Sequence, residues 1–144
     1  MDFGGTFGEY NSYQTRTTVF DGEPPDRFPT IHVIVVEALE AGLHAAAPGM
    51  TARELDGVVR NVIDGAGYGE QFVTGTGHGI GLRAHEPPSI DQHDDTTLEA
   101  GMAFTIEPGI YLEGAFGVRL ETVVLLGEDG AGAINKSTHD WRAC

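Results

Sequence analysis

The chain has a single cysteine, Cys144, and a single lysine, Lys136, among its 144 residues. One cysteine cannot form a disulfide within the chain, so a disulfide framework is excluded and a reducing compartment, the cytoplasm, is expected. The longest apolar run, Val33–Val36, is far too short to cross a bilayer. The first residues also do not combine a basic segment with an apolar one, so we expect no secretory signal.

Positive charge is scarce throughout the sequence. There are 22 acidic residues against 8 basic ones, which gives a net charge of −14. Such a surface repels phosphate groups, so neither nucleic acid nor an anionic membrane is expected as a partner. Hydrophobic residues make up 40% of the chain and charged residues 21%, which is the composition of a globular protein of one domain.

The first half of the chain predicts a β-hairpin followed by two helices. Residues 1–20 combine three glycines with β-forming residues and predict the hairpin. Apolar residues recur at helical spacing over 28–47, and Pro48-Gly49 ends that helix. Thr51 and Glu54 form a capping box that begins a second helix, which ends near Gly65. His32 and His44 lie on the first helix, where surface or packing roles are the ordinary expectation.

The second half predicts strands. A short strand is expected in 70–79, and two longer ones in 100–112 and 116–126. Residues 128–144, with His139 and Trp141, form a tail. No repeat or linker divides the chain, so the prediction is one α+β unit in which a hairpin and two helices accompany a mainly antiparallel sheet.

Two glutamates stand in apolar surroundings. Glu107 ends the run Phe104–Ile106, and Glu121 precedes four apolar residues. A half-buried carboxylate needs an arginine or a metal as its partner. Arg119 lies two residues before Glu121 and could supply an Arg–Glu pair. With His78, the glutamates also form a set of ligands suited to zinc, manganese, cobalt or iron.

Three segments carry a family resemblance: "GTGHGIGL..HE.P" (75–88), "L..GM.FTIEPGIY" (98–111) and "GVRLE" (117–121). They resemble the metal-binding motifs of the M24, or pita-bread, metallopeptidases, and most closely those of Xaa-Pro aminopeptidases and Xaa-Pro dipeptidases (prolidases). The resemblance implies a truncated pita-bread fold that holds only the C-terminal part of the catalytic domain. Residues 1–20 would be the last hairpin of the first half-repeat, 28–127 the second half-repeat, and 128–144 a tail.

The same resemblance implies roles for individual residues. It assigns metal binding to four of them: Asp2, His78, Glu107 and Glu121. It assigns catalysis to His85 and Glu107, and support of the site to Thr15, Tyr111 and Arg119. Tyr13 stands where the family has an aspartate that bridges two metals, and a phenol cannot replace a bidentate anion. We therefore expect one divalent ion (Mn, Co, Zn or Fe) to bind tightly and a second to bind weakly or not at all.

The function implied by the resemblance is metal-dependent hydrolysis of the Xaa-Pro bond at the N-terminus of a peptide, through metal-activated water. Two alternatives remain open. One is a metal-free or inactive pita-bread homologue, either a creatinase-like hydrolase or a peptide-binding module, and the other is a non-functional gene fragment. Apolar faces left uncovered by the truncation favour a homo-oligomer.

Overall fold

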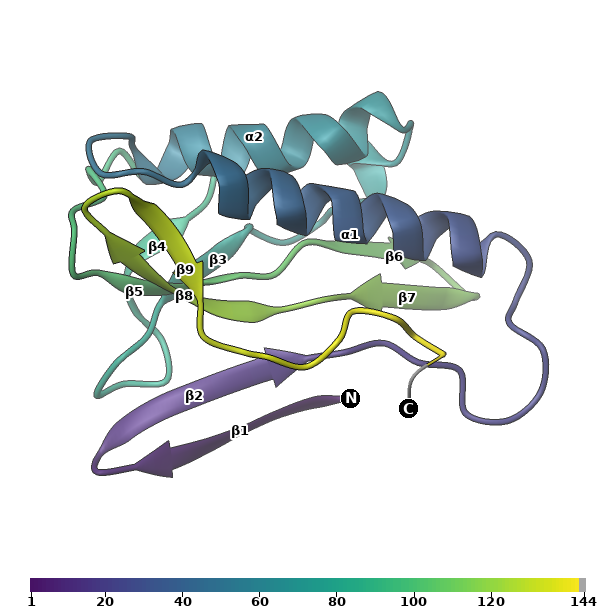
Figure 1. Cartoon of the computed structure of the whole chain (residues 1–144). Coiled ribbons are helices and arrows are strands. Elements are labelled where there is room, and N and C mark those ends of the chain that lie inside the picture. The colour runs from purple at the N-terminus through teal and green to yellow at the C-terminus, as the bar shows by residue number, and fades with distance from the viewer. Residues whose placement is uncertain (143–144) are drawn as a thin grey trace.

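A computed structural model describes residues 1–142, in which two helices cover one face of a layer of strands and a hairpin lies on the opposite side (Figure 1). The helices are α1 (Phe28–Ala45) and α2 (Ala52–Gly65), with a 3-10 helix, η1, at Gly69–Gln71. The strands are β1 (Asp2–Phe7), β2 (Tyr10–Thr15), β3 (Gly77–Gly79), β4 (Glu86–Ile90), β5 (Ala103–Ile106), β6 (Gly109–Leu112), β7 (Phe116–Arg119), β8 (Thr122–Gly127) and β9 (Gly130–Ala133). The α+β prediction is confirmed.

The strands form three antiparallel sheets. The largest has five strands in the order β4-β3-β5-β8-β9, while β1-β2 and β6-β7 are separate pairs. A bridge between Thr15 and Glu121 connects β2 to the residue before β8. The hairpin is therefore attached to the main sheet at one of the glutamates singled out in the sequence.

The two helices follow the predicted pattern closely. The amide of Glu54 donates to the hydroxyl of Thr51 (3.1 Å), and the amide of Thr51 donates to the carboxylate of Glu54 (2.7 Å), so the capping box is confirmed. A Cβ at Gly42 would lie 2.7 Å from Val59 Cγ2, so a glycine is what lets α1 approach α2. The apolar helix faces pack on the sheet in one core that includes Ile31, Val35, Leu39, Leu55, Val59, Ile63, Phe104 and Ile106.

The strand predictions need four corrections. The expected strand 100–112 breaks between β5 and β6, because Pro108 has no N–H to continue the ladder. The expected strand 116–126 breaks between β7 and β8, where the Glu121 amide donates to the Thr15 carbonyl (3.0 Å). In 70–79, only β3 is extended, and η1 occupies the beginning. Strands β4 and β9 were not predicted.

The tail folds against the rest of the molecule. In Figure 1 the yellow chain after β9 passes the end of β2 and continues toward β7. Trp141 packs edge-on against Phe28, with ring centroids 5.3 Å apart. Within residues 1–142, neither helix combines the length and apolar character needed to cross a membrane.

Candidate metal centre

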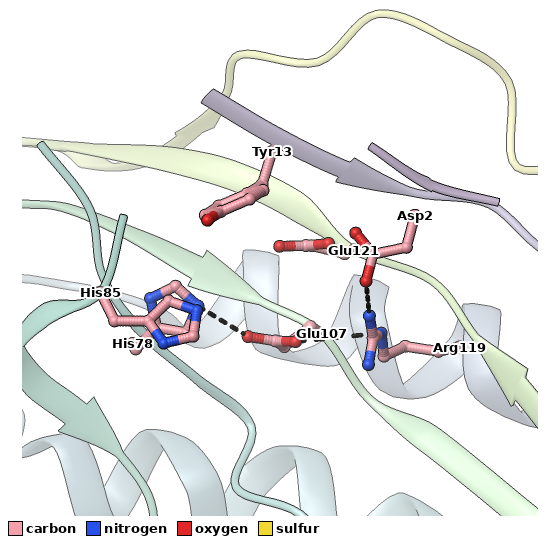
Figure 2. Close-up of a pocket in the computed structure, with 7 residues that line it drawn as sticks. All are labelled: Asp2, Tyr13, His78, His85, Glu107, Arg119 and Glu121. Atoms are coloured by element: carbon pink, nitrogen blue, oxygen red, sulfur yellow. Dashed lines mark hydrogen bonds and ion pairs between the residues drawn. The ribbon is translucent and has the colours of Figure 1, made fainter. Parts of the chain in front are cut away.

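Seven side chains line a pocket of about 310 Å³ between the hairpin and the main sheet: Asp2, Tyr13, His78, His85, Glu107, Arg119 and Glu121. Figure 2 shows Asp2 and Tyr13 entering from the hairpin and the two histidines lying on the opposite side. The expected metal ligands and the expected catalytic residues therefore line one cavity.

His78 sits on β3 between two glycines whose backbones are tightly packed. A Cβ at Gly77 would lie 2.0 Å from the Thr105 carbonyl oxygen, and a Cβ at Gly79 would lie 2.4 Å from the Pro87 carbonyl oxygen. The glycines are needed because β3 lies between β5 and β4 at this close distance. This packing carries the imidazole into the pocket.

The two ring nitrogens of His78 have different surroundings. Nδ1 lies 2.9 Å from the Gly79 carbonyl oxygen and therefore carries a proton, and Nε2 lies 3.2 Å from Glu107 Oε1. Burial lowers the pKa of His78, but the bonds to Glu107 and Gly79 outweigh it, so the pKa lies above its ordinary value. In metal-binding histidines a backbone carbonyl commonly accepts the Nδ1–H bond in this way. The other nitrogen, Nε2, is then the atom that can coordinate a metal.

Glu107 follows β5 at the strand break and is oriented by its neighbours. Thr105 Oγ1 donates to Glu107 Oε1 (2.9 Å), and the His78 amide donates to the same Thr105 hydroxyl (3.0 Å). The Glu107 amide donates to the Thr76 carbonyl (2.7 Å). Thr105 thus links the backbone of His78 to the carboxylate of Glu107, a role that our sequence analysis missed. The signal was present, because residues two apart on a strand share a face.

Glu121 is the most buried of the acidic pocket residues, at 3% exposure. The Thr15 hydroxyl donates to Glu121 Oε2 over 2.6 Å. Burial raises the pKa of Glu121; Glu107 and Asp2 raise it further, whereas Thr15 and Arg119 lower it. Thr15 thus orients this carboxylate, and its supporting role in the site stays a prediction.

Asp2 and Arg119 form an ion pair across the pocket (Figure 2). Arg119 Nε also lies 3.9 Å from Glu107 Oε2, and Arg119 Nη2 lies 3.4 Å from the Thr15 hydroxyl. Burial lowers the pKa of Arg119, but Tyr111 and the two carboxylates outweigh it and raise the pKa. The guanidinium is therefore shared between Asp2 and Glu107, rather than forming a pair with Glu121 alone.

Tyr13 and His85 complete the wall of the pocket. The rings of His78 and His85 lie 3.9 Å apart between centroids, and the Tyr13 ring lies 6.1 Å from His85 and 6.2 Å from His78. The Tyr13 ring points toward these imidazoles (Figure 2). His85 is an exposed residue in the loop between β3 and β4, so it can reach a molecule in the pocket.

The residues present fit one divalent cation. His78, Glu107 and Glu121 each offer a ligand atom, and these atoms lie within 4.8 Å of one another. One imidazole and two carboxylates are a usual donor set for zinc and related ions. Burial, and after it the charges of Glu107 and Asp2, raise the pKa of Glu121, so a cation placed between these carboxylates would be favourable. Asp2 does not belong to this group of three, because its carboxylate pairs with Arg119.

Comparisons with known proteins agree with this picture. The model of metallopeptidase family M24 matches residues 1–128. The chain is 46% identical over 140 residues to an Xaa-Pro dipeptidase of Pyrococcus furiosus, covering 97% of the chain and 40% of that protein. The solved prolidase from P. furiosus superimposes with a TM-score of 0.92 at 46% identity, over 95% of this chain and 40% of that one. An X-Pro aminopeptidase from Thermotoga maritima gives a TM-score of 0.92 at 44% identity, over 96% and 39%. The chain thus spans about 40% of the length of these relatives.

Proposed function

The chain belongs to metallopeptidase family M24, and from this premise we propose that its pocket supports metal-dependent hydrolysis of Xaa-Pro peptides. The pita-bread fold expected from the sequence is confirmed by the superposition on prolidases. One observation carries the proposal: His78, Glu107 and Glu121, which come from three separate β segments, bring their ligand atoms within 4.8 Å of one another. The relatives' names supply the substrate class, an Xaa-Pro peptide.

In this proposal His78 Nε2, Glu107 and Glu121 would hold one divalent ion, and the chemistry it would supply is polarisation of the scissile carbonyl and a lowered pKa of a water molecule. Glu107 accepts the proton of the attacking water, because its carboxylate is already fixed by Thr105. His85 donates a hydrogen bond to the carbonyl oxygen as negative charge develops on it. Its position beside His78 and its exposure to the pocket support this role.

Arg119 has a structural part in the same scheme. It keeps Asp2 at the edge of the pocket, where the carboxylate can also face the amino group of a peptide. A charged carboxylate placed for this purpose would recognise a free N-terminus and orient the first residue. Tyr13 occupies the remaining side, so a second bridging carboxylate is not available from this position, and we propose one tightly bound ion.

A specific observation also favours the second candidate, a metal-free peptide-binding module. His78 and Glu107 contact each other directly, and Arg119 already balances Asp2. These pairs could hold the pocket together without an ion. The two candidates differ in whether an ion binds and whether a peptide is cleaved.

The test titrates the chelator-treated chain with Mn²⁺, Co²⁺ or Zn²⁺ by calorimetry and measures proline release from an Xaa-Pro dipeptide. We expect about one equivalent to bind and cleavage to require the ion. Glu121→Gln should weaken binding by at least about tenfold, whereas Glu99→Gln, an exposed matched control, should not. Failure of the chain to bind any of these ions would overturn the proposal, and peptide binding without cleavage would support the metal-free alternative.

A further inference from the structure

One carboxamide in the tail, that of Asn135, joins the hairpin to the main sheet beside the pocket. Asn135 Oδ1 accepts hydrogen bonds from the Val123 amide (2.6 Å) and the Thr122 hydroxyl (3.0 Å). Asn135 Nδ2 donates to the carbonyl oxygen of Tyr13 (3.0 Å). An amide donor on one side and a carbonyl acceptor on the other fix the orientation of the carboxamide. Thr122 and Val123 begin β8 directly after Glu121, and Tyr13 belongs to β2.

The hairpin depends on such connections for its position. All of β1 is exposed, and β1 and β2 pair only with each other as a sheet. An isolated two-stranded hairpin is marginally stable in water, so its place is set by what it touches. Besides Asn135, the contacts include the bond from the Glu121 amide to Thr15 and the bond from the Asn11 amide to the Gly81 carbonyl (2.9 Å).

The position of the hairpin matters for the pocket because three hairpin side chains take part in it. The hairpin supplies Asp2 and Tyr13 to the pocket wall, and it supplies the Thr15 hydroxyl that orients Glu121. A movement of β2 away from β8 would withdraw all three groups together. A displacement of about 1 Å in such a site is enough to reduce its function strongly.

We propose that Asn135 is a positioning residue for the pocket, because its carboxamide holds β2 at the distance from β8 at which Thr15 fixes Glu121. The effect of Asn135 on ion binding rests on the proposed function, in which Glu121 is a metal ligand. Asn135 lies outside the residues that the family model matches, 1–128. The residue acts through the hairpin and touches neither substrate nor ion.

Arg16 makes a parallel connection but is a poorer residue to test. Its guanidinium donates to the carbonyls of Glu121 (2.6 Å) and Thr15 (2.8 Å), and also to Thr138 (2.9 Å). Arg16 is 5% exposed, so its removal would open a void beside the hairpin and take a donor from the Glu121 carbonyl, which would disturb the fold broadly. Asn135 is half-buried and can be changed without a change of shape.

The decisive variant is Asn135→Asp. The carboxylate can still accept from Val123 and Thr122, but it presents an oxygen instead of an N–H to the Tyr13 carbonyl. The bond to the hairpin is therefore replaced by repulsion between two oxygen atoms, while the bonds to β8 can remain. Asn61→Asp, on the exposed face of α2, adds the same charge elsewhere and is the matched control. Asn135→Ser, which shortens the side chain, is the second variant if Asn135→Asp does not fold.

The first measurement is amide hydrogen exchange of the ion-free chain. In Asn135→Asp we expect the Glu121 and Asn11 amides to exchange at least about tenfold faster, while Leu126, bonded within the main sheet, is unchanged. If the Glu121 and Asn11 amides of Asn135→Asp exchange as slowly as they do in the wild-type chain, the proposal is overturned. If Leu126 also loses protection, the fold has failed, and Asn135→Ser is judged by the same criteria.

The second measurement is Mn²⁺ affinity by calorimetry. We expect Asn135→Asp to weaken binding by about tenfold and Asn61→Asp to leave it unchanged, since loss of a group that orients a ligand has effects of this size. Faster exchange with unaltered affinity would show that the hairpin does not set the ligand and would overturn the positioning role. If the wild-type chain binds no Mn²⁺, the proposed function fails, while the exchange result still decides whether Asn135 holds the hairpin.

Discussion

Tyr13 stands where the family resemblance leads us to expect an aspartate. Its ring lies about equally far from the two pocket histidines, and its side chain fills the wall opposite Arg119. A phenol offers one oxygen, whereas a carboxylate offers two oxygens and a negative charge. Compared with the expected aspartate, Tyr13 would supply one charge and one ligand atom fewer to the hairpin side of the pocket.

We predict that Tyr13→Asp raises the number of bound ions from about one to about two, because a carboxylate here can bridge two cations. Metal analysis after dialysis against Mn²⁺ measures the change. Tyr13→Phe removes only the hydroxyl and should leave the number as in the wild-type chain. Tyr10→Asp places the same charge on an exposed residue of β2 and should also have no effect. An unchanged metal content in Tyr13→Asp would mean that Tyr13 is not what limits the second ion.

Helix α2 does not line the pocket, but its residue Asp56 fixes a segment that contacts Glu107. Asp56 is fully buried on this helix and accepts two bonds from Arg60, at 2.8 and 3.0 Å. Asp56 Oδ1 also accepts from the amide and the hydroxyl of Thr76, at 3.2 and 2.8 Å. The Thr76 carbonyl in turn receives the Glu107 amide, so this ion pair fixes the segment that precedes β3.

We predict that Asp56→Asn lowers the free energy of unfolding by about 3 kcal/mol, since it leaves a largely buried guanidinium without its counter-charge. Breaking a buried ion pair costs about 3–5 kcal/mol. We expect the low end of this range because Arg60 still donates to the carbonyls of Phe72 and Thr74. Urea unfolding at constant m-value measures the loss. Asp64→Asn, on the exposed side of the same helix, is the control and should change stability little. A loss in Asp56→Asn no larger than in this control would contradict the prediction.

The helices could be predicted from the sequence because their signals are local. The spacing of Ile31, Val35 and Leu39 and the Thr51–Glu54 capping box each lie within one element, and both were found as expected. Strand ends depend on partners far away in the sequence. The break before β8 exists because the Glu121 amide turns to Thr15 of the hairpin, which no local pattern reveals.

Strands β4 and β9 also could not be predicted from local sequence, because they form only through their pairing partners. β4 contains Pro87-Pro88, and β9 is built of glycine and alanine, so neither has the composition of a strand. They pair because β3 and β8 offer them an edge. The family motifs named the side chains that line the pocket, and the roles given to them stay predictions. The Asp2–Arg119 pair and the Thr105 link depend on tertiary packing, which no motif shows.

The tail and α1 bury one histidine, His32, and partly cover a second, His139, which connects the stability of the whole molecule to pH. His32 is 4% exposed, and within residues 1–142 its Nε2 has no hydrogen-bond partner. Burial lowers the pKa of His32, which Asp140 partly offsets, and burial also lowers the pKa of His139, which Glu40 partly offsets. Both imidazoles are therefore neutral in the folded chain at pH values where the unfolded chain has already bound protons.

The sign of the effect follows from this difference. A group with a lowered folded pKa contributes stability that is fully present above its unfolded pKa and is lost as the pH falls toward its folded pKa. For His32 and His139 the loss begins near the ordinary value of 6.5. His78, with its raised pKa, acts in the opposite sense, so the contribution of His32 must be isolated by comparing variants.

We predict that His32→Leu loses less stability than the wild-type chain when the pH falls from about 7 to about 5, by up to about 1.4 kcal/mol per pH unit. Above pH 7 the variant should be close to the wild type, because leucine fills the apolar site without an unpaired nitrogen. Urea unfolding at several pH values gives the slope. His44→Leu, which removes an exposed histidine from the same helix, should keep the wild-type slope. A slope in His32→Leu equal to that of His44→Leu would show that burial of His32 does not control the acid sensitivity of the fold.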